Sequence, residues 1–400
     1  MIPLVSWSFF QGREYLRGND FIPYLKKNMQ TVGIGKDPDF PILTEDLDDH
    51  HLFMVGEIHG FKIPQQLDHE LFAFLHQNHD FDTYLLEMDM SQAYFMNRFN
   101  ETGSDSLLKR ILSTWVVRPG QSNLDYIQRF KKLREIYQIG EGFTYIGNNG
   151  ISDPELLSAH LSELFPNQSW EINPDLEDST NLLNIKEQLL PIIEGQQALT
   201  GTNDAHSELG LILKNINYFI ARTNREEVLT QNALDLYELH GLKNKNVYGY
   251  FGLGHTLKAP LKGGYEAMAS RLIRKDDWFK GHLLAANFIF TDSHMAITSS
   301  TLPSFLQDDA PQTRVSVSHD SIWMSYLYGI EDLKRLTAAG TTTIFKLNGE
   351  NSPYKESKRL LSMMQLLPMG PLMHASDDRN TAEYLDYVIL VRDSDWAKPI

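Results

Sequence analysis

Seven short runs rich in apolar and β-branched residues recur along this chain, and longer segments with helical spacing separate them. The runs cover residues 52–56, 83–88, 143–148, 246–252, 282–291, 341–347 and 387–392. Segments 65–77 and 124–137 repeat their apolar residues at the spacing of a helix. Because this alternation is typical of strands joined by helical crossovers, it predicts an α/β fold with a mainly parallel central sheet flanked by helices.

One long stretch interrupts this alternation. Residues 153–245 contain several helical segments and no convincing strand, so we expect a helical insertion between two strands of the sheet. The runs in the C-terminal part, at about 296–400, would complete the sheet. No repeat and no Pro/Gly/Ser-rich linker divides the chain, and the sequence therefore predicts a single α/β domain over residues 1–400.

Composition excludes several classes of function. The net charge of −16 argues against a nucleic-acid partner or an anionic membrane surface, because both select basic patches. The chain has no cysteine, which rules out disulfides, thiolate nucleophiles and cysteine-bound zinc or iron–sulfur centres. Any metal would have to be bound by histidine and carboxylate side chains.

The hydropathy pattern predicts a chain that does not span a membrane. No apolar stretch approaches the ~20 residues that a transmembrane helix needs. The start, "MIPLVSWSFFQGRE", has a short apolar run without the basic region and small-residue cleavage site of a secretory signal. We therefore expect a cytoplasmic protein, with export by an unrecognised route left open.

Polar side chains follow four of the predicted strands, at the point where each strand ends. In open parallel sheets the ligand site lies beyond the carboxyl ends of the strands, so these residues are the candidates for chemistry. They are Glu57 and His59 after the first run, Glu87 and Asp89 after the second, Asn148 and Asn149 after the third, and His255 after the fourth.

Both histidines end a Gly-x-x-His pattern, "GEIH" at 56–59 and "GLGH" at 252–255. With 26 glycines and 14 histidines the pattern arises about once by chance, so its occurrence alone carries little weight. Each copy, however, directly closes an apolar strand, and we expect both histidines to face one site. For Glu87 the alternative is a carboxylate that merely caps the next helix.

The helical segment before the second Gly-x-x-His pattern carries a mixed stripe. Arg225, Leu229 and Asn232 lie at i, i+4 and i+7, which places a guanidinium, an aliphatic group and an amide on one face. A stripe that faces the core seldom holds an arginine unless the charge is paired. The alternative is a surface helix on which Glu226 and Glu227 solvate Arg225.

Other candidates point to no second site. His69 and His76 share one face of the predicted helix 65–77 with several polar residues, which favours a solvated face over a pair of ligands. No Gly-x-Ser-x-Gly elbow, P-loop or dinucleotide-binding glycine pattern occurs, so the commonest serine-hydrolase, triphosphatase and dehydrogenase families are not indicated.

Four motifs in this order resemble the superfamily that unites erythromycin esterases, the haem-binding lipoprotein ChaN and the TraB/Tiki proteins. They are "GEIHG", "LLEMD", "REEVLTQN" and "FGLGHT". The resemblance covers most of residues 50–295, and "YLDYVILVRDSDWAKP" looks like the closing strand of that superfamily. It implies an α/β fold and a hydrolytic or ligand-binding site at the strand ends.

The motifs depart from each branch in some positions. Erythromycin esterases usually have one more residue between the glutamate and histidine of the first motif, and Gly252 stands where their last motif has an earlier histidine. Here the chain is closer to ChaN and Tiki. Trp115 and the long helix after it look more like the esterase branch. The helix motif has Glu226 for the usual aspartate and Leu229 for methionine.

Two histidines and two glutamates at one site suit the activation of water. Without a metal, His59 deprotonates the water, Glu57 or Glu87 orients the imidazole, and Arg225 or His255 neutralises the oxyanion. With a metal, His59, His255, Glu57 and Glu87 supply the nitrogen and oxygen ligands that suit zinc, manganese or cobalt.

The leading hypothesis is therefore a soluble hydrolase of an ester, lactone or amide that acts on a small molecule or a peptide. The alternative is a haem- or metal-binding protein of the ChaN type without catalysis. Pocket walls are expected from the insertion at 153–220 and from loops near 296–335.

Overall fold

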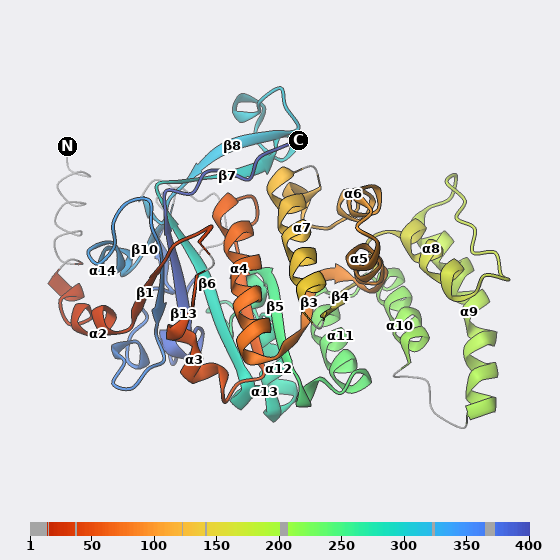
Figure 1. Ribbon diagram of the computed structural model, residues 1–400, viewed down its shortest axis with the longest axis horizontal. Helices are drawn as coiled ribbons and strands as arrows, with labels where there is room; N and C mark the ends of the chain where they lie inside the picture. Colours follow the sequence, from red (N-terminus) through yellow and green to blue (C-terminus); the bar gives the residue numbers. More distant parts are fainter. Residues whose placement is uncertain are drawn as a thin grey trace.

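An eight-stranded sheet forms the centre of the computed structural model, which describes residues 14, 16–36, 38–121, 123–140, 142–200, 207–321, 325–364 and 373–400 (Figure 1). The strand order is β1-β11-β13-β6-β2-β5-β3-β4. The strands are β1 Met29–Val32, β2 Leu52–Glu57, β3 Phe81–Asp89, β4 Thr144–Asn149, β5 Asn246–Gly252, β6 Leu283–Thr291, β11 Thr342–Lys346 and β13 Tyr387–Arg392.

The sheet is parallel over six strands, from β13 through β6, β2, β5 and β3 to β4. Only β11 and β1 run antiparallel to their neighbours. In the register at the centre, Val55 of β2 lies between Tyr250 of β5 and Ala286 of β6. The prediction of an α/β fold with a mainly parallel sheet is confirmed, and each of the seven predicted runs forms a strand.

The structure also contains short strands that the pattern did not indicate. These are β1, the pair β7 Ser293–Thr298 with β8 Gln312–Val317, and a small sheet of β9 Asp320–Ser321, β10 Ser325–Leu327 and β12 Met363–Met364. Most of their residues are only partly buried. They therefore lack the continuous apolar run that marks a strand covered on both faces.

Helices cover both faces of the sheet, which is why its inner strands are apolar throughout. Phe53 and Val55 of β2 pack on one side with α3 Pro41–Leu47, α4 Lys62–His79, α5 Met90–Thr102, α6 Asp105–Ser113 and α7 Leu124–Ile139. Leu52 and Met54 pack on the other with α11 Arg225–Leu239, α12 Met268–Lys275 and α13 Asp277–His282. The period of two along the strand thus divides the core into two layers.

Four helices connect β4 to β5, namely α8 Pro154–Leu164, α9 Asp178–Thr200, α10 Glu208–Ile220 and α11. Parts of α8, α9 and α10 enclose an apolar cluster of their own, which includes Leu157, Leu182, Ile185 and Ile212. In Figure 1 these three helices lie beyond the edge strand β4. No strand forms among the described residues between 150 and 245. The division of the chain into domains stays a prediction.

The remaining helices of the described chain are short: α2 Ile22–Lys27 and α14 Ile330–Lys334, with 3-10 turns such as η4 Leu253–His255. No described helix has the length and apolar character needed to cross a bilayer.

The face of α4 that carries His69 and His76 is partly buried, so it is less solvated than expected. Asp68 and Glu70 are buried there, and the ring of His76 stacks on Phe72. The reason is that α7 packs along α4 (Figure 1) and its Arg129 forms an ion pair with Asp68. When the partner of a charged helix residue comes from a distant segment, the sequence alone suggests that the residue is exposed to solvent.

Candidate active site

The sheet order brings three of the predicted strand ends together. β5 lies between β2 and β3, and Glu57 at the end of β2 is in register with Gly252 at the end of β5. Glu87 lies close to the end of the other neighbour, β3. The five predicted residues, Glu57, His59, Glu87, Arg225 and His255, consequently come into contact with one another, although their roles stay predictions.

His59 is oriented by a buried carboxylate. Its Nδ1 lies 2.8 Å from Oε1 of Glu57, which assigns the Nδ1 proton to that hydrogen bond. Oε2 of Glu57 accepts hydrogen bonds from Nε2 of Gln65 at 2.5 Å and from the hydroxyl of Tyr250 at 3.0 Å. Nε2 of His59 therefore stays free as an acceptor, and it lies 3.8 Å from Oε2 of Glu87.

A chain of buried polar side chains continues behind Glu57. Oε1 of Gln65 accepts a hydrogen bond of 2.9 Å from Nη1 of Arg129, and Nε of Arg129 lies 3.1 Å from Oδ2 of Asp68. The hydroxyls of Tyr84 and Tyr248 both donate to Asp68. Because Arg129 and Asp68 balance each other's charge, the pair can be buried, and the chain of contacts joins α4 and α7 to the strand that carries Glu57.

This buried chain escaped the sequence analysis. Gln65 and Asp68 lie at i and i+3 on a helix face that otherwise packs in the core, and that spacing is the only signal the sequence offers. Arg129, on α7 and 61 positions beyond Asp68, could not be assigned to it by pattern.

His255 has a carboxylate partner of its own. Nδ1 of His255 lies 2.6 Å from Oε1 of Glu226, and Oε2 of Glu226 accepts the backbone N–H of Met268 at 2.8 Å. Glu226 thus places a buried carboxylate beside the outer ring nitrogen of His255 at ion-pair distance, whereas Glu57 forms a hydrogen bond with His59. From the sequence, Glu226 was interpreted as a surface charge or as a position of the helix motif, without a histidine partner.

The alternative of a solvated surface helix is therefore wrong for α11. Glu226 faces His255, while Glu227 pairs with Arg271 at 2.9 Å and Lys275 at 2.6 Å. Of the predicted stripe, Leu229 is buried in the core. Asn232 donates to the backbone carbonyls of Asn148 at 3.0 Å and Asn149 at 3.3 Å, and so supports the end of β4.

Glu87 lies between the two histidines. Its Oε1 accepts a hydrogen bond of 2.5 Å from Nη2 of Arg225, and its Oε2 accepts one of 2.6 Å from the backbone N–H of Gly252. Oε1 also lies 3.7 Å from Nε2 of His255. Arg225 in turn contacts Nε2 of His255 through Nη1 at 3.3 Å. The guanidinium, which is 41% exposed, is the most accessible charge of the group.

The capping alternative for Glu87 is wrong, because Asp89 performs that role. Oδ1 of Asp89 accepts a hydrogen bond from the backbone N–H of Gln92. In return, the side-chain oxygen of Gln92 accepts a hydrogen bond from the backbone N–H of Asp89, which completes a capping box. Oδ2 of Asp89 accepts both the backbone N–H and the hydroxyl of Ser152. Asp89 is thus a structural residue that also ties β3 to the segment after β4.

The pKa values of two members, Glu87 and His59, are shifted by their surroundings. Burial by itself raises the pKa of Glu87, but the positive charges around it lower that pKa to about 2. Burial by itself lowers the pKa of His59, but the hydrogen bond to Glu57 and the charge of Glu87 outweigh it and raise that pKa above its usual value. Glu87 is therefore an anion at neutral pH, and His59 is a stronger base than a free imidazole.

Two glycines allow the strand ends to approach this closely. A Cβ on Gly252 would lie 3.1 Å from Nε2 of His59, so a side chain there would enter the space between the two histidines. A Cβ on Gly56 would lie 2.2 Å from Oδ1 of Asn287 and 2.7 Å from the Cα of Leu253. Glycine at these positions keeps the reactive nitrogen of His59 accessible.

The donor set does not fit a metal ion in this arrangement. Both oxygens of Glu57 are taken by hydrogen bonds, and the guanidinium of Arg225 contacts both His255 and Glu87. Within the described parts of the chain, no group of three or more histidine, aspartate or glutamate side chains is arranged to hold a metal. The use of zinc, manganese or cobalt by His59, His255, Glu57 and Glu87 stays a prediction of the sequence.

A cavity of about 360 Å³ borders this group of residues, and we call it the Arg222 pocket. It is lined by Val116, Asn149, Gly150, Ile151, Ser152, Tyr218, Phe219, Arg222, Thr223, Arg225 and Val228. Arg225 belongs both to the pocket and to the site, and Nε of Arg225 lies 3.3 Å from Oδ1 of Asn149. The wall comes partly from the insertion, as expected, but no described residue of the loops near 296–335 lines it.

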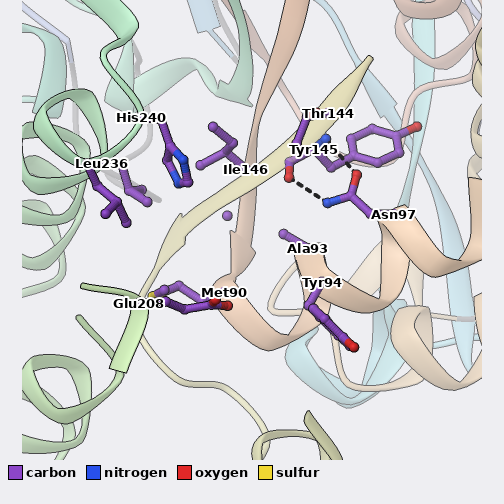
Figure 2. A pocket seen from close by; sticks show the side chains of 12 residues that line it. Met90, Ala93, Tyr94, Asn97, Thr144, Tyr145, Ile146, Glu208, Leu236 and His240 are labelled. Atoms are coloured by element: carbon purple, nitrogen blue, oxygen red, sulfur yellow. Dashed lines mark hydrogen bonds between the residues drawn. The ribbon is translucent and has the colours of Figure 1, made fainter. Parts of the chain in front are cut away.

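A second cavity, of about 150 Å³, lies at the outer edge of β4 (Figure 2). The five predicted residues do not line it. Asn97 of α5 lies on this side and exchanges hydrogen bonds with the backbone N–H and carbonyl of Tyr145, at 2.8 and 2.9 Å (Figure 2). This amide occupies the free edge of the sheet as a further strand would.

Solved structures with the same fold give an external comparison. A protein from Bacillus cereus matches with a TM-score of 0.66 at 13% identity, over 96% of this chain and 99% of that one. A succinoglycan biosynthesis protein matches with 0.63 at 13%, over 95% and 98%. A mutant of the erythromycin esterase EreC in its open conformation matches with 0.59 at 14%, over 92% and 98%.

At these identities the likeness establishes the fold. It agrees with the resemblance to the erythromycin esterase superfamily that the four motifs carry, and it extends over nearly the whole chain. No protein-family model matches the sequence, and no curated protein does.

Proposed function

We propose that this protein hydrolyses an ester, lactone or amide with a water molecule that His59 activates. The observation that carries the proposal is the hydrogen bond between Nδ1 of His59 and the buried carboxylate of Glu57. Such a carboxylate fixes the tautomer and stabilises the imidazolium that forms in catalysis. The EreC esterase shares the fold, which makes the reaction type plausible for this scaffold.

The first step is the attack of water on the carbonyl carbon. Nε2 of His59 accepts a proton from the water while its oxygen forms a bond to that carbon, and Glu57 stabilises the resulting cation. The carbonyl oxygen becomes an oxyanion. Arg225, the exposed cation of the group, neutralises it, and His255 positions Arg225 by accepting a hydrogen bond from its Nη1.

The second step is the departure of the leaving group. The bond from the tetrahedral carbon to the leaving oxygen or nitrogen breaks, and His59 returns its proton to that atom. Glu87, an anion at the centre, holds Arg225 and the backbone of Gly252 in place throughout. The protein ends each cycle in its starting protonation state.

The test is an esterase and peptidase panel on protein purified without chelator, run with EDTA and then with added zinc, manganese or cobalt. We expect hydrolysis that EDTA does not abolish. His59→Ala and His255→Ala should each lower kcat/KM by about 10²–10⁴-fold, with melting temperatures close to that of the wild type. Hydrolysis that requires an added metal would contradict the metal-free mechanism.

A haem titration of the same protein distinguishes the ChaN-type alternative, haem binding without catalysis, from hydrolysis. A saturable Soret band that disappears in His59→Ala, together with no hydrolysis in the panel, would replace hydrolysis by haem binding. Retained hydrolysis in His59→Ala would overturn the assignment of His59 as the base.

A further inference from the structure

The Arg222 pocket has a charge opposite to that of the protein. The chain carries 52 acidic residues against 36 basic ones, yet the pocket is lined by two arginines and by no aspartate or glutamate. A cavity with one sign of charge and low-dielectric walls raises the local concentration of ligands of the other sign. The lining therefore selects for an anion in a molecule whose overall field repels one.

The two arginines of the pocket differ in their bonding. Arg225 is bound to Glu87 at 2.5 Å and to Asn149 at 3.3 Å, so a carboxylate already balances its charge. Arg222 is exposed, and its guanidinium has no hydrogen bond or ion pair within the part of the chain that the structure describes. The unbalanced positive charge of the pocket thus belongs to Arg222.

The backbone at Arg222 is also unusual for its residue type. Arg222 N donates to the carbonyl of Phe219 at 3.1 Å and Thr223 N to that of Tyr218 at 3.0 Å, which closes the C-terminus of α10 with a Schellman motif. The φ of Arg222 is +51°, in the left-handed region where glycine is the usual residue. An arginine is strained there, and such strain is concentrated at functional sites.

Apolar groups form the other part of the wall. Val116, Ile151 and Phe219 line the cavity beside the two arginines. A ligand that fills about 360 Å³ would place an aliphatic or aromatic portion against them. Arg225 lines this space and also contacts Glu87 and His255, so the pocket borders the reacting residues.

We propose that the Arg222 pocket binds an anionic group of the substrate, a carboxylate or a phosphate, through Arg222, with an apolar portion of the same molecule against Phe219 and Ile151. The inference rests on the proposed hydrolysis for its reacting bond, but the binding step stands separately. Arg222 acts as a specificity residue. The alternative is that Arg222 only complements the negative C-terminal end of α10.

The kinetic experiment compares two esters of equal chain length, 4-nitrophenyl hemiadipate, which is an anion, and 4-nitrophenyl hexanoate, which is neutral. In Arg222→Gly the KM for the hemiadipate should rise about 10- to 100-fold, the range expected for a lost charge-assisted hydrogen bond, with kcat nearly unchanged. The KM for the hexanoate should not change. Arg222→Lys should restore part of the loss.

Arg222→Gly is chosen because glycine suits the left-handed backbone, so this variant should fold at least as well as the wild type. The matched control is Arg314→Ala, which removes one exposed arginine from the β7–β8 pair and leaves the pocket intact. It should leave both KM values unchanged. Equal KM shifts for the two esters, or none, in Arg222→Gly would overturn the proposal.

Calorimetry separates binding from hydrolysis. The wild type should bind 4-phenylbutyrate or phenyl phosphate at least 10-fold more tightly than neutral 4-phenylbutyramide, and Arg222→Gly should abolish the difference. The tighter of the two anions identifies the source of the negative charge. Selective binding without hydrolysis would refute the proposed function and retain the anion site. Hydrolysis without anion selectivity would support the proposed function and refute the anion site.

Discussion

The two histidines of the site are supported in different ways. The carboxylate of His59 is held by two side chains, Gln65 and Tyr250, and the buried Arg129–Asp68 pair lies behind them. The carboxylate beside His255 is held by one backbone N–H and by the partly exposed Tyr265, and the other nitrogen of the His255 ring contacts the exposed Arg225. The first half of the site is fixed deep in the core, whereas the second half borders the pocket.

The difference matches the two tasks that the proposed hydrolysis assigns to the site. A general base needs one tautomer and one orientation, which a buried and fully hydrogen-bonded carboxylate provides. Groups that neutralise an oxyanion must accept substrates of varied shape, so they can lie on the accessible side. The contrast can be tested by weakening each half separately.

The largest effect is expected from the buried ion pair. Arg129→Met removes the partner of Asp68 and the donor to Gln65, and it should lower the free energy of unfolding by about 3–5 kcal/mol. Denaturant unfolding measures this loss. The matched control is Lys275→Met, which breaks the partly exposed pair with Glu227 and should cost at most about 1 kcal/mol. Similar losses in both variants would mean that the support behind His59 is no stronger than a surface pair.

A smaller effect is expected from the two orienting carboxylates. Glu57→Gln should lower kcat by about 10–100-fold, and Glu226→Gln by less, since orienting groups contribute about that much. Steady-state kinetics measure both. An equal loss in the two variants would remove the distinction between the halves.

The pH profile of Glu57→Gln gives a second readout. His59 must be neutral to accept a proton, so activity falls as the pH drops below its pKa. Because the hydrogen bond to Glu57 and the charge of Glu87 raise that pKa, loss of the Glu57 charge should lower it. The acid limb of kcat/KM should therefore move to lower pH, whereas Glu226→Gln should leave it closer to its original position.

The smallest effect is expected from a single methyl group between the halves. Gly252→Ala places a Cβ 3.1 Å from Nε2 of His59, so the ring must shift by a few tenths of an ångström, and kcat should fall about tenfold with little change in melting temperature. The control is Gly281→Ala, where a Cβ would meet nothing within 4 Å. Unchanged kinetics in Gly252→Ala would show that this space is not used by the reaction.

The sequence predicted the fold through its buried strands. Runs such as 52–56 and 387–392 are covered on both faces, and strands buried in this way consist of consecutive apolar residues that can be recognised in the sequence. The strands β7 and β8 are half-exposed, and β1 is short, so their patterns do not differ enough from those of loops.

The residues at the strand ends could be predicted from the sequence, but the residues that hold them in place could not. Glu57, His59, Glu87 and His255 directly follow or end apolar strands, and this position alone marked them. Glu226 looked like a surface charge because its partner, His255, follows β5 and lies 29 positions further along the chain. Gln65, Asp68 and Arg129 depend on the packing of α4 against α7, which no local pattern contains.

The position of β5 in the sheet has a consequence for biosynthesis. β5 pairs with both β2 and β3, yet it follows β2 by 189 positions, because β2 ends at Glu57 and β5 begins at Asn246. At roughly 5–20 residues per second, about 10–40 s pass on the ribosome before this strand emerges. During that time β2 and β3 have no common neighbour, and their apolar edges are exposed. The contacts that join Glu57, Glu87 and His255 can therefore form only after β5 and the turn that follows it have been synthesised.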